Sequence, residues 1–181
     1  PIRIAPGIWW VGCYLPDDNL QCLTYLIEDG DQSVLIDPGS RLTIGHTLRK
    51  IRQVMSFDQI RYFICHHQDP DLTAALPEID EIVTRKDAVV ISHQRGNALL
   101  RHYNIGMPFA CCEKMGWELS LPHRRLKFVF TPYLHFPGAF CTFDEETGIL
   151  FSSDLFGGLT KEWQLVAQDE NYFDAIRPFH E

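Results

Sequence analysis

Apolar residues near the start of the chain fall in short runs separated by turn residues. Residues 7–14 and 22–28 are rich in aromatic and β-branched side chains, and residues 33–36 form a short apolar run that ends at residues 37–39. An acidic segment with a glycine, residues 28–31, separates the second run from the third. Short runs bounded by Gly, Pro and Asp are typical of strands. The pattern therefore predicts a β-meander at this end of the chain.

The middle of the chain alternates between helical and strand patterns. Apolar residues recur at helical intervals over residues 44–55 and 71–83, although Pro77 interrupts the second pattern. We expect a further helix over residues 93–103. Buried strands are predicted between these helices by the apolar runs at residues 60–65 and 88–92.

Strand patterns return in the last part of the chain. Residues 125–131 predict a strand, and residues 140–143 and 149–152 flank an acidic turn in the pattern of a hairpin. A helix is expected around residues 172–176. Two β-layers covered by helices fit this order of elements better than one doubly wound sheet. The sequence therefore predicts a layered fold of the α/β (α+β) class.

Composition and charge limit the classes of function. The 181 residues suit one domain, and a hydrophobic content of 45% is enough for a core. A net charge of −8 without a basic stripe argues against a nucleic-acid partner. Neither a membrane-spanning apolar run nor a leader is visible, so we expect a cytoplasmic location and no membrane partner. The six cysteines form no CxxC pair, and we expect them to be buried small side chains in a reducing compartment.

Polar side chains recur where the predicted strands end. Asp37, the segment of residues 66–71, His135 and Asp154 each follow an apolar strand. Loops at one edge of a rigid sheet are where binding and catalytic residues are most often found. We therefore expect these groups to share one edge of the fold.

The segment HHQDPD, residues 66–71, is the first candidate for metal chemistry. His67, Asp69 and Asp71 alternate, so in an extended segment they share a face and converge on one point or on two adjacent points. Pro70 holds Asp69 in an extended conformation. The alternative is a solvated loop in which Asp71 caps the helix that follows.

His135 and Asp154 strengthen the metal hypothesis. His135 lies in TPYLHFPGAF and Asp154 in GILFSSDLFGG, both among apolar and aromatic residues. A buried polar or charged group without a partner is costly, so each of these side chains needs one. A simple Asp–His hydrogen bond in the core is the alternative to a shared metal.

The motifs HxDxD, LHFP and LFSSDLFG, in this order, resemble the metallo-β-lactamase fold. They are specifically similar to the diiron core of the flavodiiron proteins and of the related oxygen-binding diiron protein (ODP) family. The segments APGIWWVG, LTYLIEDGDQSVLIDPGS and DLTAALP also match, so the likeness spans most of the chain. It implies a metallo-β-lactamase-like αββα sandwich over residues 1–181, of the sensor type without a flavodoxin domain. We expect this single domain to be an excised or C-terminally truncated input domain of a longer signalling protein.

The resemblance also implies a set of ligands for two non-haem irons. His67, Asp69 and His135 would bind one iron, Asp71 would bind the other, and Asp154 would bridge them. Three carboxylates with two imidazoles offset most of the charge of two divalent ions, and mixed oxygen and histidine ligands suit non-haem iron. Zinc is the alternative, but the zinc hydrolases of this superfamily resemble HxHxDH, with a histidine where this chain has Asp69.

The chain departs from the family pattern at three places. Leu72 replaces the histidine that usually follows the aspartate, which leaves the second iron one ligand short. His66 is an extra histidine, and in an extended loop it points away from His67. The last histidine of the family lies farther beyond Asp154 than His180 does, so either His180 stands in for it or the chain ends before it.

We predict from these features a diiron O₂-binding sensory domain that forms an oxygen adduct and is no enzyme by itself. No phosphate loop or remaining length offers an FMN site, so the chain has no electron source of its own. The resemblance implies a homodimer and a covalently linked output domain such as a diguanylate cyclase. The alternatives are a reductase of O₂, NO or peroxide fed by a separate redox partner, a zinc hydrolase and a non-metal binding module. Four aromatic residues either shield the pocket or belong to the core: Tyr133, Phe136, Phe151 and Phe156.

Overall fold

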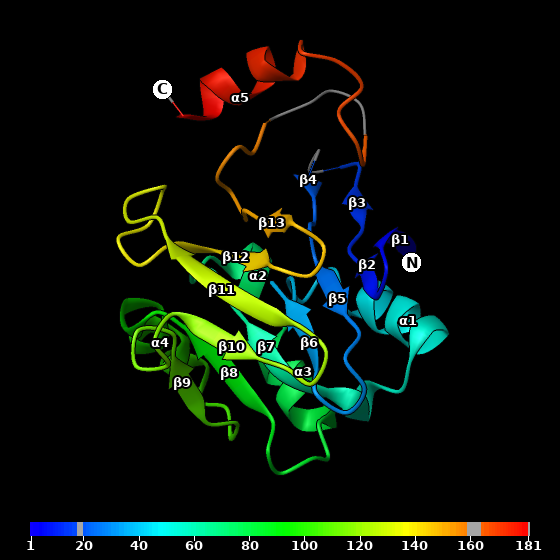
Figure 1. Ribbon diagram of the computed structural model, residues 1–181, viewed down its shortest axis with the longest axis vertical. Coiled ribbons are helices and arrows are strands. Elements are labelled where there is room, and N and C mark those ends of the chain that lie inside the picture. The colour runs from blue at the N-terminus through cyan, green and yellow to red at the C-terminus, as the bar shows by residue number, and fades with distance from the viewer. Residues whose placement is uncertain (18–19, 159–163, 181) are drawn as a thin grey trace.

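Two β-sheets face each other in the computed structural model, which describes residues 1–17, 20–158 and 164–180 (Figure 1). The larger sheet, in spatial order, contains β1 (Ile2–Ala5), β2 (Ile8–Trp10), β5 (Tyr25–Ile27), β6 (Ser33–Ile36), β7 (Ile60–Ile64), β8 (Val89–Ser92) and β9 (Phe109–Cys111). The smaller sheet contains β10 (Glu118–Ser120), β11 (Arg125–Phe130), β12 (Phe140–Asp144) and β13 (Ile149–Phe151). The helices are α1 (Ile44–Val54), α2 (Pro70–Thr73), α3 (Leu76–Ile82), α4 (Gln94–Leu100) and α5 (Tyr172–His180), with short 3₁₀ helices at Phe57–Gln59 and Arg101–Tyr103.

The larger sheet changes from antiparallel to parallel pairing at β6. Strands β1, β2, β5 and β6 pair antiparallel, which confirms the predicted meander, and β6 to β9 pair parallel through helical connections. The predicted hairpin of β12 and β13 also forms, with Asp144 opposite Ile149. The prediction omitted strands β1, β9 and β10 and the small hairpin of β3 (Tyr14–Leu15) with β4 (Leu20–Gln21). These strands are only two to four residues long, too short for a clear apolar pattern.

Side chains of the larger sheet alternate between two separate cores. In β7, Phe63 packs with the helices, whereas Tyr62 and Ile64 pack against the smaller sheet. The same alternation places Leu35 in the helical core and Ile36 in the core between the sheets. Alternation with both faces covered is the signature of a sheet inside a layered fold. The predicted metallo-β-lactamase-like α/β fold is thereby confirmed.

The helix predicted over residues 71–83 is two helices instead of one. Helix α2 ends at Thr73 and α3 begins at Leu76, with Pro77 in its first turn. Proline lacks a backbone N–H and is tolerated at the start of a helix but not in its interior. The proline that interrupts the apolar pattern therefore begins a second helix.

The cysteines are mostly buried, as expected: five of the six are buried and Cys111 is half-buried. Over the ranges that the structure describes, none of the helices combines the length and the apolar character that crossing a membrane requires.

Gly12 gives a direct test of the close approach between neighbouring chain segments. A β-carbon at Gly12 would lie 1.8 Å from the carbonyl oxygen of Cys22, whereas one at Gly45 in α1 would meet nothing within 4 Å. We expect Gly12→Ala to lower the free energy of unfolding by about 1–3 kcal/mol, as overpacking does. Gly45→Ala should raise it by about 0.5–1 kcal/mol through helix propensity. Urea unfolding measures both values, and equal effects would contradict the packing described here.

Candidate metal centre

The loop after β7 contributes His67 and Asp69. Asp69 occupies the N-cap position of α2, and Pro70 follows it as the first helical residue. The hydroxyl of Thr73 donates to the Asp69 carbonyl oxygen at 2.9 Å, which ties the loop to the helix. The Gln68 side-chain amide donates to Asp69 Oδ1 at 2.7 Å, so the other carboxylate oxygen, Oδ2, is left to face the histidines.

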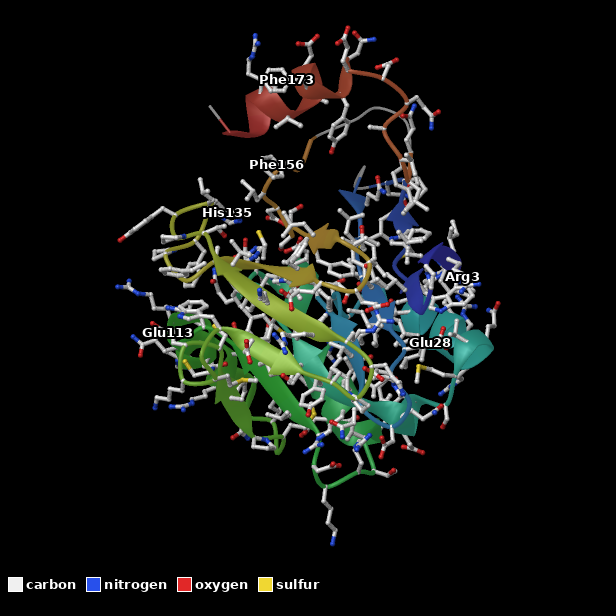
Figure 2. All side chains as sticks on the ribbon, in the orientation of Figure 1. Arg3, Glu28, Glu113, His135, Phe156 and Phe173 are labelled. Carbon is white, nitrogen blue, oxygen red and sulfur yellow. The ribbon has the colours of Figure 1, made fainter. Side chains whose placement is uncertain are left out.

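The connection between β11 and β12 contributes His135. The backbone N–H of Thr131 donates to the Ala139 carbonyl, and Tyr133 donates to Phe136, so the hairpin continues as a closed loop. Tyr133 has a φ of 66°, a conformation that non-glycine residues rarely adopt. The loop holds the His135 side chain half-exposed at the edge of the sandwich, on the side that faces α5 (Figure 2).

A tight turn after β13 contributes Asp154. The N–H of Gly157 donates to the Asp154 carbonyl at 2.9 Å, and a β-carbon at Gly157 would lie 2.9 Å from that same oxygen. Ser153, directly before this turn, and Phe156, within it, have positive φ values of 53° and 68°. Backbone strain of this kind is concentrated at functional sites.

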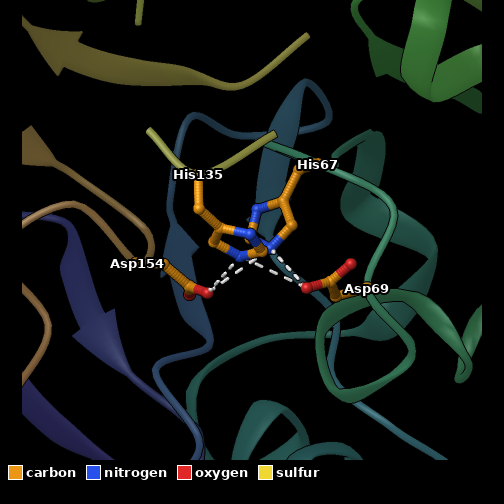
Figure 3. Close-up of side chains that lie close together, drawn as sticks. All are labelled: His67, Asp69, His135 and Asp154. Atoms are coloured by element: carbon orange, nitrogen blue, oxygen red, sulfur yellow. Dashed lines mark hydrogen bonds and ion pairs between the residues drawn. The ribbon is translucent and has the colours of Figure 1, made fainter. Parts of the chain in front are cut away.

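Four side chains from these three loops converge on one point, as Figure 3 shows. One potential ligand atom from each of His67, Asp69, His135 and Asp154 lies within 4.8 Å of all the others. His67 Nε2 lies 3.4 Å from Asp69 Oδ2 and 3.5 Å from Asp154 Oδ2. His135 Nε2 lies 3.3 Å and 3.1 Å from the same two oxygens. Two nitrogens and two oxygens therefore surround a common centre.

The buried nitrogen of His67 shows that this cluster fits a metal ion. His67 is 2% exposed, and its Nε2 atom has no hydrogen-bond partner of good geometry. Its other ring nitrogen, Nδ1, lies 3.4 Å from the Ser153 hydroxyl, which turns Nε2 toward the carboxylates. A buried polar atom without a partner is costly, and a divalent cation would satisfy it. Imidazole with carboxylate is also a donor set that binds transition metals.

Neighbouring charges shift the pKa values of three members of the cluster, His67, Asp69 and Asp154. Burial alone lowers the pKa of His67, but the carboxylates of Asp154 and Asp69 outweigh burial and raise this pKa to about 10. The neighbouring His67 ring lowers the pKa of Asp69. Burial opposes ionisation of Asp154, but His67 and His135 hold its pKa below the usual value. The two carboxylates of the cluster thus stay ionised and would attract a cation.

Asp71 lies near the four-residue cluster without joining it. Burial, followed by the negative charges of Asp154 and Asp69, raises the pKa of the Asp71 carboxyl. Asp71 is in the first turn of α2 and Asp69 is at its N-cap, so the alternative role of Asp71 as the cap is wrong. Asp71 thus lies within electrostatic range of the cluster.

The three departures from the family pattern have different outcomes. His66 is fully buried, and its ring nitrogens contact Asp37 and Thr142 instead of the cluster. Leu72 is also buried, and its carbonyl accepts a hydrogen bond from the Gly39 N–H. The His180 side chain lies outside the described residues, so its predicted role as a substitute ligand stays a prediction.

The aromatic residues near the site divide between core and surface. Phe151 is buried and packs against Tyr25, with ring centroids 5.1 Å apart. Tyr133 and Phe156 are 70% and 57% exposed, so neither is a core residue.

The sequence did not predict the supporting roles of Gln68 and Ser153. The contact of Gln68 with Asp69 and the positive φ of Ser153 leave no pattern in the sequence.

The chain is similar to known proteins over most of its length. The family model described as "ODP family beta lactamase" matches residues 20–181. The type A flavoprotein fprA of Rhodobacter capsulatus is 29% identical over 99% of this chain, and a nitric oxide reductase of Moorella thermoacetica is 30% identical over 87% of it. The chain covers 46% and 42% of these two proteins, so it spans less than half of their length.

Solved structures show the same fold. The flavodiiron protein of Giardia intestinalis superposes with a TM-score of 0.85 at 21% identity, over 98% of this chain and 46% of that one. A structure described as a peroxy diiron species of the chemotaxis sensor ODP superposes with a TM-score of 0.81 at 25% identity. This second alignment covers 96% of the chain and 70% of the sensor, a larger share than for the flavodiiron protein.

The raised pKa of His67 predicts how the stability of the metal-free protein depends on pH. The folded-state pKa of about 10 lies above the ordinary histidine value of 6.5, so the charged ring stabilises the fold, and this stabilisation is fully present below pH 6.5. That contribution is lost as the pH rises toward 10. Metal-free protein, prepared with a chelator, should therefore lose free energy of unfolding over this range, and His67→Gln should lose less. NMR should show one imidazole that stays charged beyond pH 8; titration of every ring below this pH would contradict the prediction.

Proposed function

The chain belongs to the ODP family of beta-lactamase-fold domains, and from this premise we propose that it is a non-haem diiron domain that senses O₂. The observation that carries the proposal is the convergence of two histidines and two aspartates around a buried imidazole nitrogen without a partner. The family relation favours iron as the metal of this cluster, because the solved structures with this fold include diiron proteins.

We assign the ligands as the sequence motifs imply. His67, Asp69 and His135 would hold one iron, Asp71 would bind the second, and Asp154 would bridge the two. The shared orientation of His67 and His135 toward the oxygens of Asp69 and Asp154 supports the first group. The raised pKa of Asp71 supports the second cation, whose charge would keep this carboxyl ionised.

Two irons in this site would supply redox chemistry with O₂, NO or peroxide. The protein's own residues supply position and environment. Gln68 fixes the Asp69 carboxylate through Oδ1, and Ser153 orients the His67 ring through Nδ1. Buried Leu72 adds an apolar side chain beside Asp71, where the family pattern has a further histidine ligand. We propose that this loss of a ligand favours holding a gas over rapid turnover.

We favour a sensor over a reductase or a hydrolase. The alignment with the chemotaxis sensor ODP covers 70% of that protein, whereas the alignment with the flavodiiron protein covers 46% of it. The curated relatives named as a flavoprotein and a nitric oxide reductase favour the second candidate, reduction of O₂, NO or peroxide with electrons from a separate partner. A zinc hydrolase is the least favoured candidate, because Asp69 stands where those enzymes resemble HxHxDH.

The partners follow from the sensory role. We propose a homodimer in the cytoplasm, with these residues forming a single input domain covalently linked to a signalling output domain. Exposed apolar side chains lie on the same two loops as His135 and Asp154: Tyr133, Leu134 and Phe156. Exposed apolar groups gathered in this way are typical of interaction sites.

Metal analysis tests the proposed centre. Protein made in iron-replete cells should contain about two irons per chain, since the ligand set suits two ions. Asp154→Ala should lose both irons if Asp154 bridges them, whereas Asp31→Ala, in an exposed turn, should keep them. Metal content by mass spectrometry measures this, and zinc without iron in the native protein would sink the proposal.

Optical spectroscopy separates the sensor from the reductase. The anaerobically reduced protein should develop a near-ultraviolet or visible band on exposure to O₂, and this band should outlast mixing by a wide margin. The same band should be missing in Asp154→Ala. Immediate decay of the band with continued consumption of reductant would instead support the reductase.

The exposed loops predict where the dimer forms. Tyr133→Ser with Leu134→Ser should weaken self-association, because it removes apolar area from the proposed interface. Ile82→Ser, which removes an exposed apolar side chain from α3, should not weaken it. Analytical ultracentrifugation over a range of concentrations gives the dissociation constant of each variant. Equal effects of the two changes would place the interface elsewhere.

A further inference from the structure

The candidate metal centre is assembled from two sheets. His67 and Asp69 follow β7 of the larger sheet, whereas His135 and Asp154 follow β11 and β13 of the smaller one. The spacing between the two pairs therefore depends on how the sheets are aligned. Metal sites need ligand positions held to within about 0.5 Å, so something must fix this alignment near the site.

His66 lies at the junction between the sheets. It follows β7 directly before His67, is fully buried, and packs edge-on against Phe140 of β12 with ring centroids 5.0 Å apart. Its Nδ1 atom lies 2.6 Å from Asp37 Oδ2, and its Nε2 atom lies 2.8 Å from the hydroxyl oxygen of Thr142 in β12. The His66 ring thus joins Asp37, at the end of β6, to β12 of the smaller sheet. We refer to Asp37, His66 and Thr142 as the His66 bridge.

Asp37 holds the other end of this bridge rigidly. Its backbone N–H donates to the Ile64 carbonyl at 2.8 Å, and its own carbonyl accepts from the Thr24 hydroxyl at 2.7 Å. Asp37 Oδ1 also accepts from the backbone N–H of His66 at 3.0 Å, so both carboxylate oxygens bind the same residue. The carboxylate can only accept, which assigns a hydrogen to His66 Nδ1, and in the neutral ring Thr142 is then the donor to Nε2.

Hydrogen bonds define the alignment more sharply than the surrounding apolar core does. Apolar contacts are non-directional, so a small slide of one sheet over the other costs little. The three members of the His66 bridge are all buried, and a slide that separated His66 from Thr142 would leave two buried polar groups without partners. The bridge therefore favours one relative position of the sheets.

We propose that His66 is a positioning residue, which fixes the spacing between the His67–Asp69 half and the His135–Asp154 half of the metal centre through Thr142. The inference rests on the proposed diiron function. It assigns the first histidine of the doublet to holding the two halves of the centre in position from outside the ligand set. It also makes the hydroxyl of Thr142, which lies in β12 outside the proposed ligand set, a determinant of metal affinity.

Thr142 allows the test without touching a residue next to a ligand. Thr142→Val keeps the shape but removes the hydroxyl, and Thr142→Ser keeps the hydroxyl. Co²⁺ is titrated into metal-free protein under argon, with affinity and coordination followed by visible absorption. We expect Thr142→Val to bind about ten-fold more weakly, the usual size of an effect transmitted from beyond the ligands. Its Co²⁺ spectrum should also change, and Thr142→Ser should restore both values.

A control separates positioning from general stability. Asp144, at the far end of the same strand, is buried and accepts from Arg124 and Thr147 at 2.8 and 2.6 Å. Asp144→Asn should lower the free energy of unfolding while the Co²⁺ affinity and spectrum stay unchanged. Wild-type affinity in Thr142→Val would overturn this inference but not the proposed function. An equal loss of affinity in Asp144→Asn would do the same. A wild-type protein that binds no metal overturns the proposed function and the inference with it.

Discussion

Alternation of side chains along the central strands is the constraint on which the rest of the structure depends. Over residues 34–36 of β6 and 62–64 of β7, successive side chains face the smaller sheet and the helices in turn, and all six are buried. Polar groups along these strands would lose water without gaining partners. Chemistry can therefore be placed only where the strands end, and this is where His67, Asp69, His135 and Asp154 lie.

The candidate metal centre is locally unfavourable in free energy, and the rigid fold around it holds its residues in place. Asp69 and Asp154 each point one oxygen at the same two histidines, which brings two carboxylates into one partly buried space. The residues beside them adopt rare backbone conformations, with positive φ at Tyr133, Ser153 and Phe156. Such local conflicts are expected where a fold serves function. A cation at the centre would relieve the repulsion and satisfy the unpartnered nitrogen of His67 together.

The sequence was most informative where strands and polar residues meet. His67, Asp69, His135 and Asp154 could be grouped because each follows an apolar run, and strand ends of one sheet edge lie close together. The separation of Asp71 from this group could not be predicted, since the turn of α2 and not the alternation of a strand sets its direction. Nor could the supporting contacts, which depend on long-range packing and on backbone angles. The geometry alone indicates a cation site, and only the family relation implies that it would hold two irons.

The histidine doublet shows how a single strand direction can serve two purposes. Ile64 of β7 faces the smaller sheet, and two residues later His66 faces the same way and reaches Thr142. His67, the next residue, faces the four-residue cluster instead, because neighbours along an extended chain point to opposite sides. A shift of this strand by one residue would exchange the two rings, so that neither the bridge nor the cluster could form. The alignment of the sheets and the assembly of the centre are therefore set by the same register.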